Sequence, residues 1–450
     1  MPRGGGRPCI MPRGRLGGTF PVRESPLQVC TDVAQGEPPP VPRTGRVGAF
    51  HAQGARPAAA AGRRSERPLI CVKGLSAMSF LSLLEPIVRD VIAPAAEATD
   101  REARFPRAAL DALGRAGLLG LVSSKEVGGL GLGLAEAAQA VQRIAQDCPS
   151  TAMVLTMHYA GTVLIEKYGQ RELREAIAAG RHVTTLAWSE VGTRSHFWAP
   201  VGTARRDGDA VVLDGFKSMI TSAVEADSYV WSSRPTQGEG ASSIWVVDSR
   251  LPGLARTAVF DGMGLRGNAS APVKAEGVRI PFACLLGEDG NGGELMNNDE
   301  LPVFTTLIAS CSIGTMDGAL ARATAHITKN RFEESGTSVS DLPTVRAYLA
   351  RAQIRADQAR VLRDDTLAAM AAGRADTMLR VLEVKASAAE AALEVTDTAM
   401  RICGGAAFRK DVGIERLFRD ARAASIMAPT SDVLYDFIGN ALCDAVAKKD

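Results

Sequence analysis

Hydrophobic residues between positions 78 and 183 recur at the spacing that places them on one face of an α-helix. The pattern is clearest in two series of side chains: Leu110, Leu113, Leu118, and Ala137, Ala140, Val141, Ile144. Turn-forming residues separate these series from one another. The sequence therefore predicts an all-helical N-terminal domain over residues 78–183.

The pattern changes after this domain to short runs that are rich in β-branched and aromatic residues. The runs extend over Val183 to Trp188, Ala210 to Leu213, Tyr229 to Ser232, Ile244 to Val247 and Val278 to Pro281. Asp207-Gly208 and Asp214-Gly215 between them are typical of tight turns. Residues 184–290 are predicted to form a compact, barrel-like β domain that is mainly antiparallel.

Helical spacing returns after Gly293 and continues towards the C-terminus. One apolar face contains Val384, Ala388, Ala391, Val395, Ala399 and Ile402. Gly404 and Gly405 end this helix, as glycine commonly does. Long helices with one apolar face and short connections predict a four-helix bundle over residues 291–450. The predicted fold class is α+β, and the chain lacks the βαβ alternation of a Rossmann sheet.

The first 77 residues differ in composition from the rest of the chain. They contain 11 Arg and one Lys against four acidic residues, whereas the whole chain of 450 residues has a net charge of +2. Gly, Pro and Ala dominate this segment, which lacks the apolar area needed to offset chain entropy. We expect residues 1–77 to be disordered or a non-native extension, with Met78 as the true start.

The remaining composition excludes several classes of protein. The eight cysteines and five histidines show no metal-binding spacing, and no run of about 18 apolar residues predicts a transmembrane helix. We expect reduced thiols, a cytoplasmic location, no metal, no nucleic acid and no membrane insertion.

Four motifs resemble those of the acyl-CoA dehydrogenase superfamily in the same order along residues 78–450. They are the Phe105-Pro106 to Gly131 stretch, Leu186 to Ser195 with Gly215 to Ser222, Arg266 to Gly287, and Gly404-Gly405 with Glu415-Arg416 and Arg419-Asp420. The second resembles "TEPxxGS" followed by "GxKxxIT", and the fourth resembles "GGxG…ERxxRD". The resemblance implies a flavoprotein with FAD as cofactor and a homotetramer, whose interface we expect on the small-residue face from Ala388 to Ala399.

The resemblance also implies which residues contact the flavin. Relatives line the flavin ring with a hydroxyl group and backbone amides from the second motif. The corresponding positions here are Leu186, Trp188, Ser189, Met219, Thr221 and Ser222.

Other FAD contacts in relatives cross a subunit boundary. They correspond to Gly404, Gly405 and Thr430, with Asp432 beside them. Arg331 is the candidate for the pyrophosphate, because the planar guanidinium group offers paired donors to phosphate oxygens. A solvated arginine at a helix end is the alternative, since the family spacing "RxxFG" is not met.

The catalytic glutamate of the family is missing. Relatives carry this base at the position of Ala428 or at the position of Phe304. A general base commonly accelerates proton transfer about a hundred- to ten-thousandfold. Ala428 retains a backbone N–H, the group with which relatives bind the thioester oxygen. Asp432 and Glu190 are replacement candidates for the base, although Glu190 also has a turn-stabilising interpretation.

Ser195 and His196 are candidates for substrate binding beside the expected cofactor edge. Imidazole exchanges a proton near neutral pH, which suits a substrate other than CoA or a flavin–oxygen adduct. The alternative is that His196 lies in a solvated loop.

The leading hypothesis is an FAD-dependent oxidoreductase that oxidises an acyl thioester at Cα–Cβ, with acyl-CoA or a related small molecule as substrate and a separate electron acceptor. Two alternatives keep the same fold. One is a flavin-dependent monooxygenase, and the other is a catalytically altered flavin-binding subunit.

Overall fold

The computed structural model describes residues 80–193, 196–256 and 261–447. The N-terminal domain is helical, as predicted, and a π-helical turn at Val88–Ile92 joins its first two helices. Buried side chains of these helices form one core with residues of the C-terminal bundle, including Phe304 and Leu307. The helices are α1 (Phe80–Ile87), α2 (Ala93–Arg101), α3 (Arg107–Arg115), α4 (Leu134–Ala145), α5 (Pro149–Tyr168) and α6 (Arg171–Ala178).

The described residues of the middle domain form two four-stranded sheets, in the orders β1-β4-β5-β8 and β2-β3-β7-β6. All strand pairs are antiparallel except β1 with β4, which confirms a mainly antiparallel domain. The strands are β1 (Thr184–Ala187), β2 (Thr203–Asp207), β3 (Ala210–Ile220), β4 (Ser228–Ser233), β5 (Ser243–Asp248), β6 (Leu254–Arg256), β7 (Ala271–Pro281) and β8 (Leu285–Leu286).

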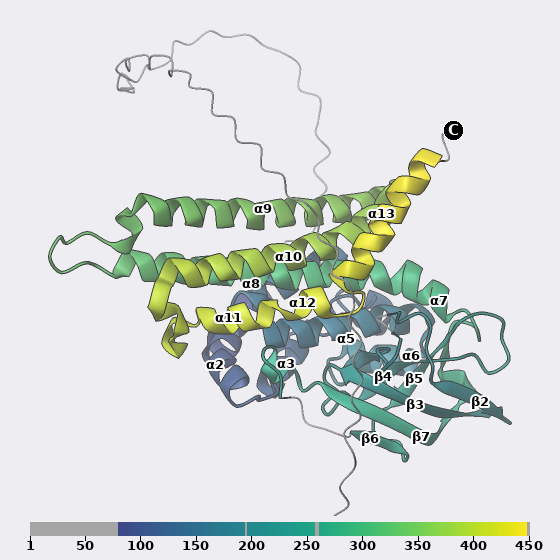
Figure 1. The fold of residues 1–450 in the computed structure, drawn as a ribbon. Helices are drawn as coiled ribbons and strands as arrows, with labels where there is room; N and C mark the ends of the chain where they lie inside the picture. The colour runs from purple at the N-terminus through teal and green to yellow at the C-terminus, as the bar shows by residue number, and fades with distance from the viewer. Residues whose placement is uncertain (1–79, 194–195, 257–260, 448–450) are drawn as a thin grey trace, which may run out of the picture. The chain divides into compact units, whose positions relative to one another are not determined.

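Both faces of the first sheet are covered. Alternate side chains of a strand point to opposite faces, and those of β4 are buried in two different cores. Tyr229 and Trp231 of β4 are buried in the core shared with the second sheet. Val230, between them, belongs to the core that contains Leu164 of α5. Helix α5 therefore attaches the β domain to the helical part of the chain (Figure 1).

The C-terminal domain is a helical bundle, as predicted. Its long helices α8, α9 and α10 pack against one another, and α13 packs against α10 (Figure 1). The segment Gly292–Lys329 is long and apolar enough to cross a membrane, but 94% of its most apolar window is buried inside the protein. The helices are α7 (Gly292–Glu294), a π-helical turn (Leu295–Glu300), α8 (Leu301–Lys329), α9 (Pro343–Ala372), α10 (Thr377–Cys403), α11 (Ile414–Ala421), α12 (Ala423–Ile426) and α13 (Ser431–Ala447).

The small-residue face of α10 does not form a free surface. Ala388, Ala391, Val395 and Ala399 are fully buried within the chain, where they pack against α8 and α9. The expectation that this face forms the subunit interface is therefore wrong. Small side chains here permit close packing of helices within one chain.

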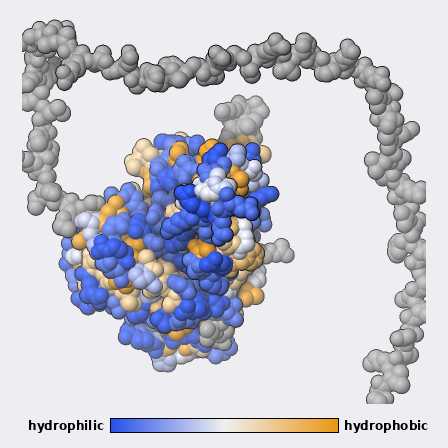
Figure 2. Space-filling view, turned by 90° about the vertical axis from the view of Figure 1, so that its left-hand side faces the viewer, coloured by the Kyte–Doolittle hydropathy of each residue, from blue (hydrophilic) through white to orange (hydrophobic). Residues whose placement is uncertain are grey.

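On the face shown in Figure 2, apolar residues are scattered among polar ones.

Candidate active site

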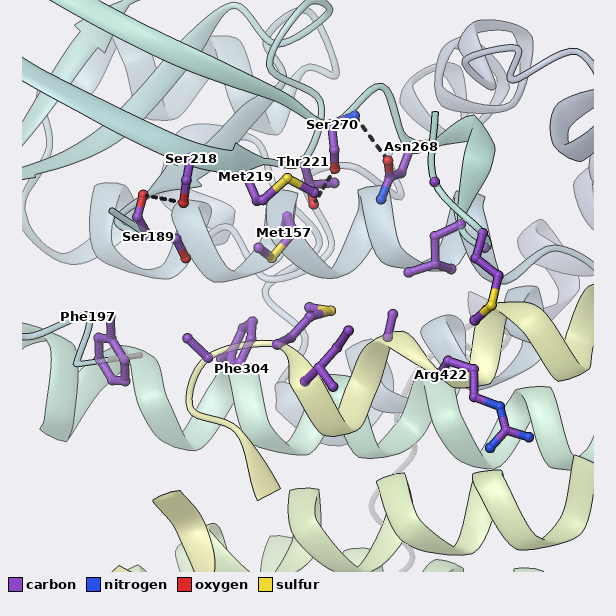
Figure 3. Close-up of a pocket in the computed structure, with 18 of the residues that line it drawn as sticks. Met157, Ser189, Phe197, Ser218, Met219, Thr221, Asn268, Ser270, Phe304 and Arg422 are labelled. Atoms are coloured by element: carbon purple, nitrogen blue, oxygen red, sulfur yellow. Dashed lines mark hydrogen bonds between the residues drawn. The ribbon is translucent and has the colours of Figure 1, made fainter. Parts of the chain in front are cut away.

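A pocket of about 490 Å³ lies between the β domain and the helices of the C-terminal domain. Helix α5 contributes Met157, the segment after β1 contributes Ser189, and the end of β3 contributes Met219 and Thr221 (Figure 3). The opposite wall consists of Phe304 of α8 and the segment from Arg422 to Ala428. A pocket of this size with mainly apolar walls is typical of a small-molecule site.

One edge of the pocket carries hydroxyl groups. Ser270 Oγ donates a hydrogen bond to Thr221 Oγ1 at 3.5 Å, and Asn268 Oδ1 accepts one from the backbone N–H of Ser270 at 3.0 Å (Figure 3). The backbone oxygen of Ser189 accepts a hydrogen bond from Ser218 N–H at 2.8 Å. The Ser189 hydroxyl forms no hydrogen bond with any described residue, so it is available to a ligand.

Ala428 forms part of the opposite wall. Its N–H donates no hydrogen bond to the described part of the chain. Ser189, Met219 and Ala428 thus line one pocket, as the family resemblance implies. Met157, Met219 and Phe304 provide apolar walls, and the free hydroxyl and amide groups provide polar contacts, a combination that fits a flavin ring.

A buried lysine holds the Ala428 segment in place. The Lys385 ammonium group of α10 donates hydrogen bonds to the carbonyls of Ala424, Met427 and Pro429 at 2.8, 3.1 and 2.7 Å. The side chain is fully buried. Burial lowers the pKa of Lys385 to about 7, and the negative charge of Glu390 opposes this shift because it favours the charged form of the lysine.

Glu190 has a structural role that makes it unsuitable as a base. Its Oε1 lies 2.7 Å from Lys217 Nζ, and both side chains are fully buried. Its carboxylate also accepts hydrogen bonds from the backbone N–H groups of Val201 and Gly202. Although Glu190 lines the pocket, these partners occupy both oxygens, so the structure supports the turn-stabilising interpretation and does not support a role as base. Burial lowers the pKa of Lys217 to about 8, against the effect of Glu190.

A second, smaller cavity of about 50 Å³ adjoins the first and shares Ser189, Met219, Phe304 and Ala428 with it. We call it the inner chamber. The inner chamber also shares Met157 and Phe197 with the first pocket, and its other lining residues are Leu186, Trp188, Ile220, Glu300 and Pro429. Sequence reasoning included Leu186 and Trp188 but missed Glu300.

Two polar atoms at the inner chamber lack partners. Trp188 Nε1 and Glu300 Oε1 are buried and form no hydrogen bond within the described residues. The Trp188 ring stacks on Phe197 with the centroids 5.8 Å apart. Burial raises the pKa of the Glu300 carboxyl group well above its ordinary value.

Several predicted cofactor residues do not line this pocket. Ser222 is buried in the turn after β3, where it has a positive φ of 60°. Arg331 is exposed and donates a hydrogen bond to the Gly336 carbonyl. Gly404 and Gly405 are exposed at the end of α10.

The start of α13 also lies outside the pocket lining. Thr430 Oγ1 accepts a hydrogen bond from Val433 N–H at 3.4 Å, so this side chain caps the helix. Asp432 is exposed in the first turn, where a carboxylate favours the positive end of the helix dipole. The structure therefore does not support Asp432 as a base, because it does not bring the carboxylate to the pocket.

Of the two predicted substrate residues, the structure describes only His196, which does not line the pocket. His196 is exposed, and its ring stacks on Trp198 with the centroids 4.8 Å apart. Ser195 lies outside the described residues. The solvated-loop interpretation therefore fits His196 better than a role at the pocket.

The fourth motif connects the three domains. The Arg419 guanidinium group donates to the Asp100 carboxylate of α2 at 2.9 and 2.5 Å and to the Met263 carbonyl at 2.8 Å. The neighbouring Asp420 accepts a hydrogen bond from Leu265 N–H at 2.6 Å. Burial raises the pKa of Asp420 to about 6.

Among the described residues, no group of three or more His, Cys, Asp or Glu side chains could hold a metal ion.

Comparisons with known proteins agree with this architecture. The chain matches the family models for the N-terminal, middle and C-terminal domains of acyl-CoA dehydrogenase over residues 78–180, 185–278 and 291–443. It is 31% identical over 351 residues to the human mitochondrial short-chain specific acyl-CoA dehydrogenase, which covers 76% of this chain and 83% of the relative. The chain belongs to the acyl-CoA dehydrogenase family, a family of flavoproteins, and is an oxidoreductase.

Other relatives are similar over most of their length. Cyclohex-1-ene-1-carbonyl-CoA dehydrogenase of Geobacter metallireducens is 29% identical over 369 residues, which are 79% of this chain and 96% of the relative. The structure of butyryl-CoA dehydrogenase from Megasphaera elsdenii matches with a TM-score of 0.76 and 21% identity, over 81% of this chain and 97% of that chain. The structural match shows the fold.

We predict that Glu190→Gln lowers the free energy of unfolding by about 3–5 kcal/mol, because the substitution leaves the buried Lys217 ammonium group without its counter-charge. Urea unfolding followed by circular dichroism measures the change. The matched control is Glu276→Gln, which removes an exposed ion pair with Lys274 and should cost at most about 1 kcal/mol. Equal stability of both variants would contradict the structural role of Glu190.

We predict that Lys385→Met lowers the free energy of unfolding by several kcal/mol, since each unpaired buried carbonyl costs about 1–3 kcal/mol. The same unfolding experiment applies. Lys329→Met, at the exposed end of α8, is the control and should stay within about 0.5 kcal/mol of wild type. A Lys385→Met protein as stable as this control would show that the three contacts contribute little.

Proposed function

We propose that this chain is an FAD-dependent dehydrogenase that oxidises an acyl thioester at Cα–Cβ. The observation that carries the proposal is the arrangement of unpaired polar groups across one pocket. The Ser189 hydroxyl is on the β-domain side, and the Ala428 N–H is on the opposite wall. Between them, the apolar side chains of Met157, Met219 and Phe304 suit a planar ring and an acyl chain.

Different residues of this chain would bind the flavin, bind the thioester and position the thioester-binding amide. Ser189 and Thr221 would contact the edge of the flavin ring, which when bound accepts a hydride from the β-carbon of the substrate. Ala428 N–H would donate a hydrogen bond to the thioester oxygen, where negative charge develops as the α-proton leaves. Lys385 would keep this donor in position through the neighbouring carbonyls.

The position of His196 favours the oxidation of an acyl thioester over the oxygenase alternative. The oxygenase hypothesis used the imidazole as a proton donor at the cofactor, yet this ring is exposed and stacks on Trp198. The similarity to the short-chain and cyclohexene-carbonyl-CoA dehydrogenases supports a short or cyclic acyl group on CoA.

Anaerobic mixing of the FAD-loaded protein with a series of acyl-CoA thioesters tests the substrate class. We predict that at least one short or cyclic acyl-CoA bleaches the visible flavin absorbance and yields the enoyl product, as seen by mass spectrometry. Acetyl-CoA is the matched negative control because it has no β-carbon. If no thioester in the series reduces the flavin, the proposed substrate class is wrong.

We further propose a homotetramer that completes the FAD site. Gly404 and Gly405 have open space around them, and Phe408 beside them is 79% exposed. Contact with another subunit would remove this apolar surface from water, which is favourable.

We predict that Phe408→Glu weakens the assembly and lowers the FAD content of the purified protein, because a carboxylate is costly to bury. Light scattering measures the mass, and the flavin absorbance measures the FAD content. The control is Val201→Glu, a similarly drastic change at a residue of the β domain that is 50% exposed. A Phe408→Glu protein with wild-type mass and FAD content would contradict this interface.

A further inference from the structure

Glu300 lies at the boundary between two kinds of helix. It is the last residue of the π-helical turn Leu295–Glu300 and directly precedes α8. π-Helical turns are often found at functional sites. Phe304 follows Glu300 by four residues, so both side chains lie on one face of the continuous helix. Both line the inner chamber together with Ala428.

The burial of Glu300 has no structural explanation among its neighbours. The residue is 2% exposed, and its side chain forms no hydrogen bond or ion pair with the described residues. An unpaired buried polar group costs about 1–3 kcal/mol. Most buried polar groups in proteins have partners, so an exception next to a ligand pocket points to a role in function.

The charged groups beside Glu300 in the chain and behind the chamber wall at Pro429 are engaged elsewhere. Asp299, its neighbour in the chain, accepts from Lys167 Nζ at 2.6 Å and from Tyr168 Oη at 2.7 Å on α5. Lys385 of α10 is bound to three carbonyls. All other residues that line the inner chamber are uncharged. Glu300 is therefore the only ionisable group among the described residues of this chamber.

We propose that Glu300 is the catalytic base, whose carboxylate takes the α-proton of the acyl thioester bound at Ala428. This inference rests on the proposed function above. The Cα–H bond breaks, the proton moves to a Glu300 oxygen, and the electron pair shifts towards the thioester oxygen. Ala428 N–H stabilises the negative charge on that oxygen. Glu300 would thus replace the glutamate that is missing at Ala428 and at Phe304.

The environment of Glu300 sets the pH dependence of this step. Burial without a partner favours the neutral acid, so the pKa is raised and only the deprotonated fraction acts as a base. Below this pKa, the fraction increases tenfold for each pH unit. The rate of α-proton removal should therefore rise with pH and level off only above the pKa of Glu300.

Exchange of the α-protons of acetyl-CoA in D2O isolates this step, because acetyl-CoA has no β-carbon and cannot reduce the flavin. The purified, FAD-loaded protein is mixed with acetyl-CoA in D2O, and mass spectrometry follows the uptake of deuterium by acetyl-CoA. We expect Glu300→Gln to lower the exchange rate about a hundredfold or more. The rate in Glu300→Gln should also lose its dependence on pH.

Two further variants make the test specific. Glu294→Gln alters an exposed glutamate in α7, immediately before the same π-helical turn, and should exchange at the wild-type rate. In the double variant Glu300→Gln with Ala428→Glu, a carboxylate returns on the other wall of the chamber, and we expect exchange to recover at least tenfold. Thermal unfolding and FAD absorbance verify that each variant is folded and loaded.

The outcomes separate this inference from the proposed function. If acyl-CoA reduces the flavin of the wild-type protein and Glu300→Gln exchanges acetyl-CoA protons within twofold of wild type, Glu300 is not the base. The dehydrogenase function would then stand without it. If no acyl-CoA reduces the wild-type flavin, the substrate class itself is wrong. A third outcome also overturns the inference. If the Glu300→Gln protein is folded, binds FAD and exchanges protons normally, but no longer prefers certain acyl groups, Glu300 contacts the substrate and is not the base.

Discussion

The geometry of the pocket depends on the three hydrogen bonds that Lys385 donates to the segment after α12. This segment has little regular structure, and its carbonyls would otherwise be buried without partners. An ammonium group has three donors and no acceptor, which matches three converging carbonyls. The contact fixes Ala424, Met427 and Pro429 relative to α10, and so fixes the amide of Ala428 between them.

A second buried lysine has the same function on the opposite wall. Lys217 of β3 binds Glu190 at 2.7 Å and the Ser232 carbonyl at 2.7 Å, which holds the segment that carries Ser189 against the β domain. The two walls of the pocket are thus positioned by buried charges from different domains. Arg419 adds a third contact, because it joins α2 to the segment around Met263. A pocket fixed in this way needs little reorganisation when a ligand binds.

Much of the fold follows from the hydrophobic pattern, and the exceptions have physical causes. The three-domain order and the five predicted strands agree with the structure. The short strands β2, β6 and β8 were missed because charged residues dominate β2, and β6 and β8 contain only three and two residues. The burial of Ala388 and Ala391 was predicted, but a pattern of apolar residues does not show whether the covering surface belongs to the same chain or to another.

The sequence predicted those pocket residues that belong to a family motif. It did not predict the residues whose role depends on their burial in the folded chain. Ser189, Met219, Thr221 and Ala428 all reach the pocket. Lys385 offered a signal, since it lies on the apolar face of α10 four residues after Val381, where a lysine must be buried with partners. Glu300 offered none, because it ends a polar run, Asn297 to Glu300, and glutamate is rarely buried.

The position of Ala428 has two tasks in relatives, the oxyanion contact and the base, and these tasks are separable. Under our proposal, proton transfer therefore does not need a glutamate at this position. The oxyanion contact uses the main chain, and any residue other than proline supplies an N–H. The base uses a side chain, and the inner chamber is bounded by several elements from which a carboxylate can reach the same space. If the base lies at the start of α8, as we propose, the position of Ala428 needs only its backbone N–H and keeps a small side chain. The space of the inner chamber beside this amide is then available to the acyl group of the proposed substrate.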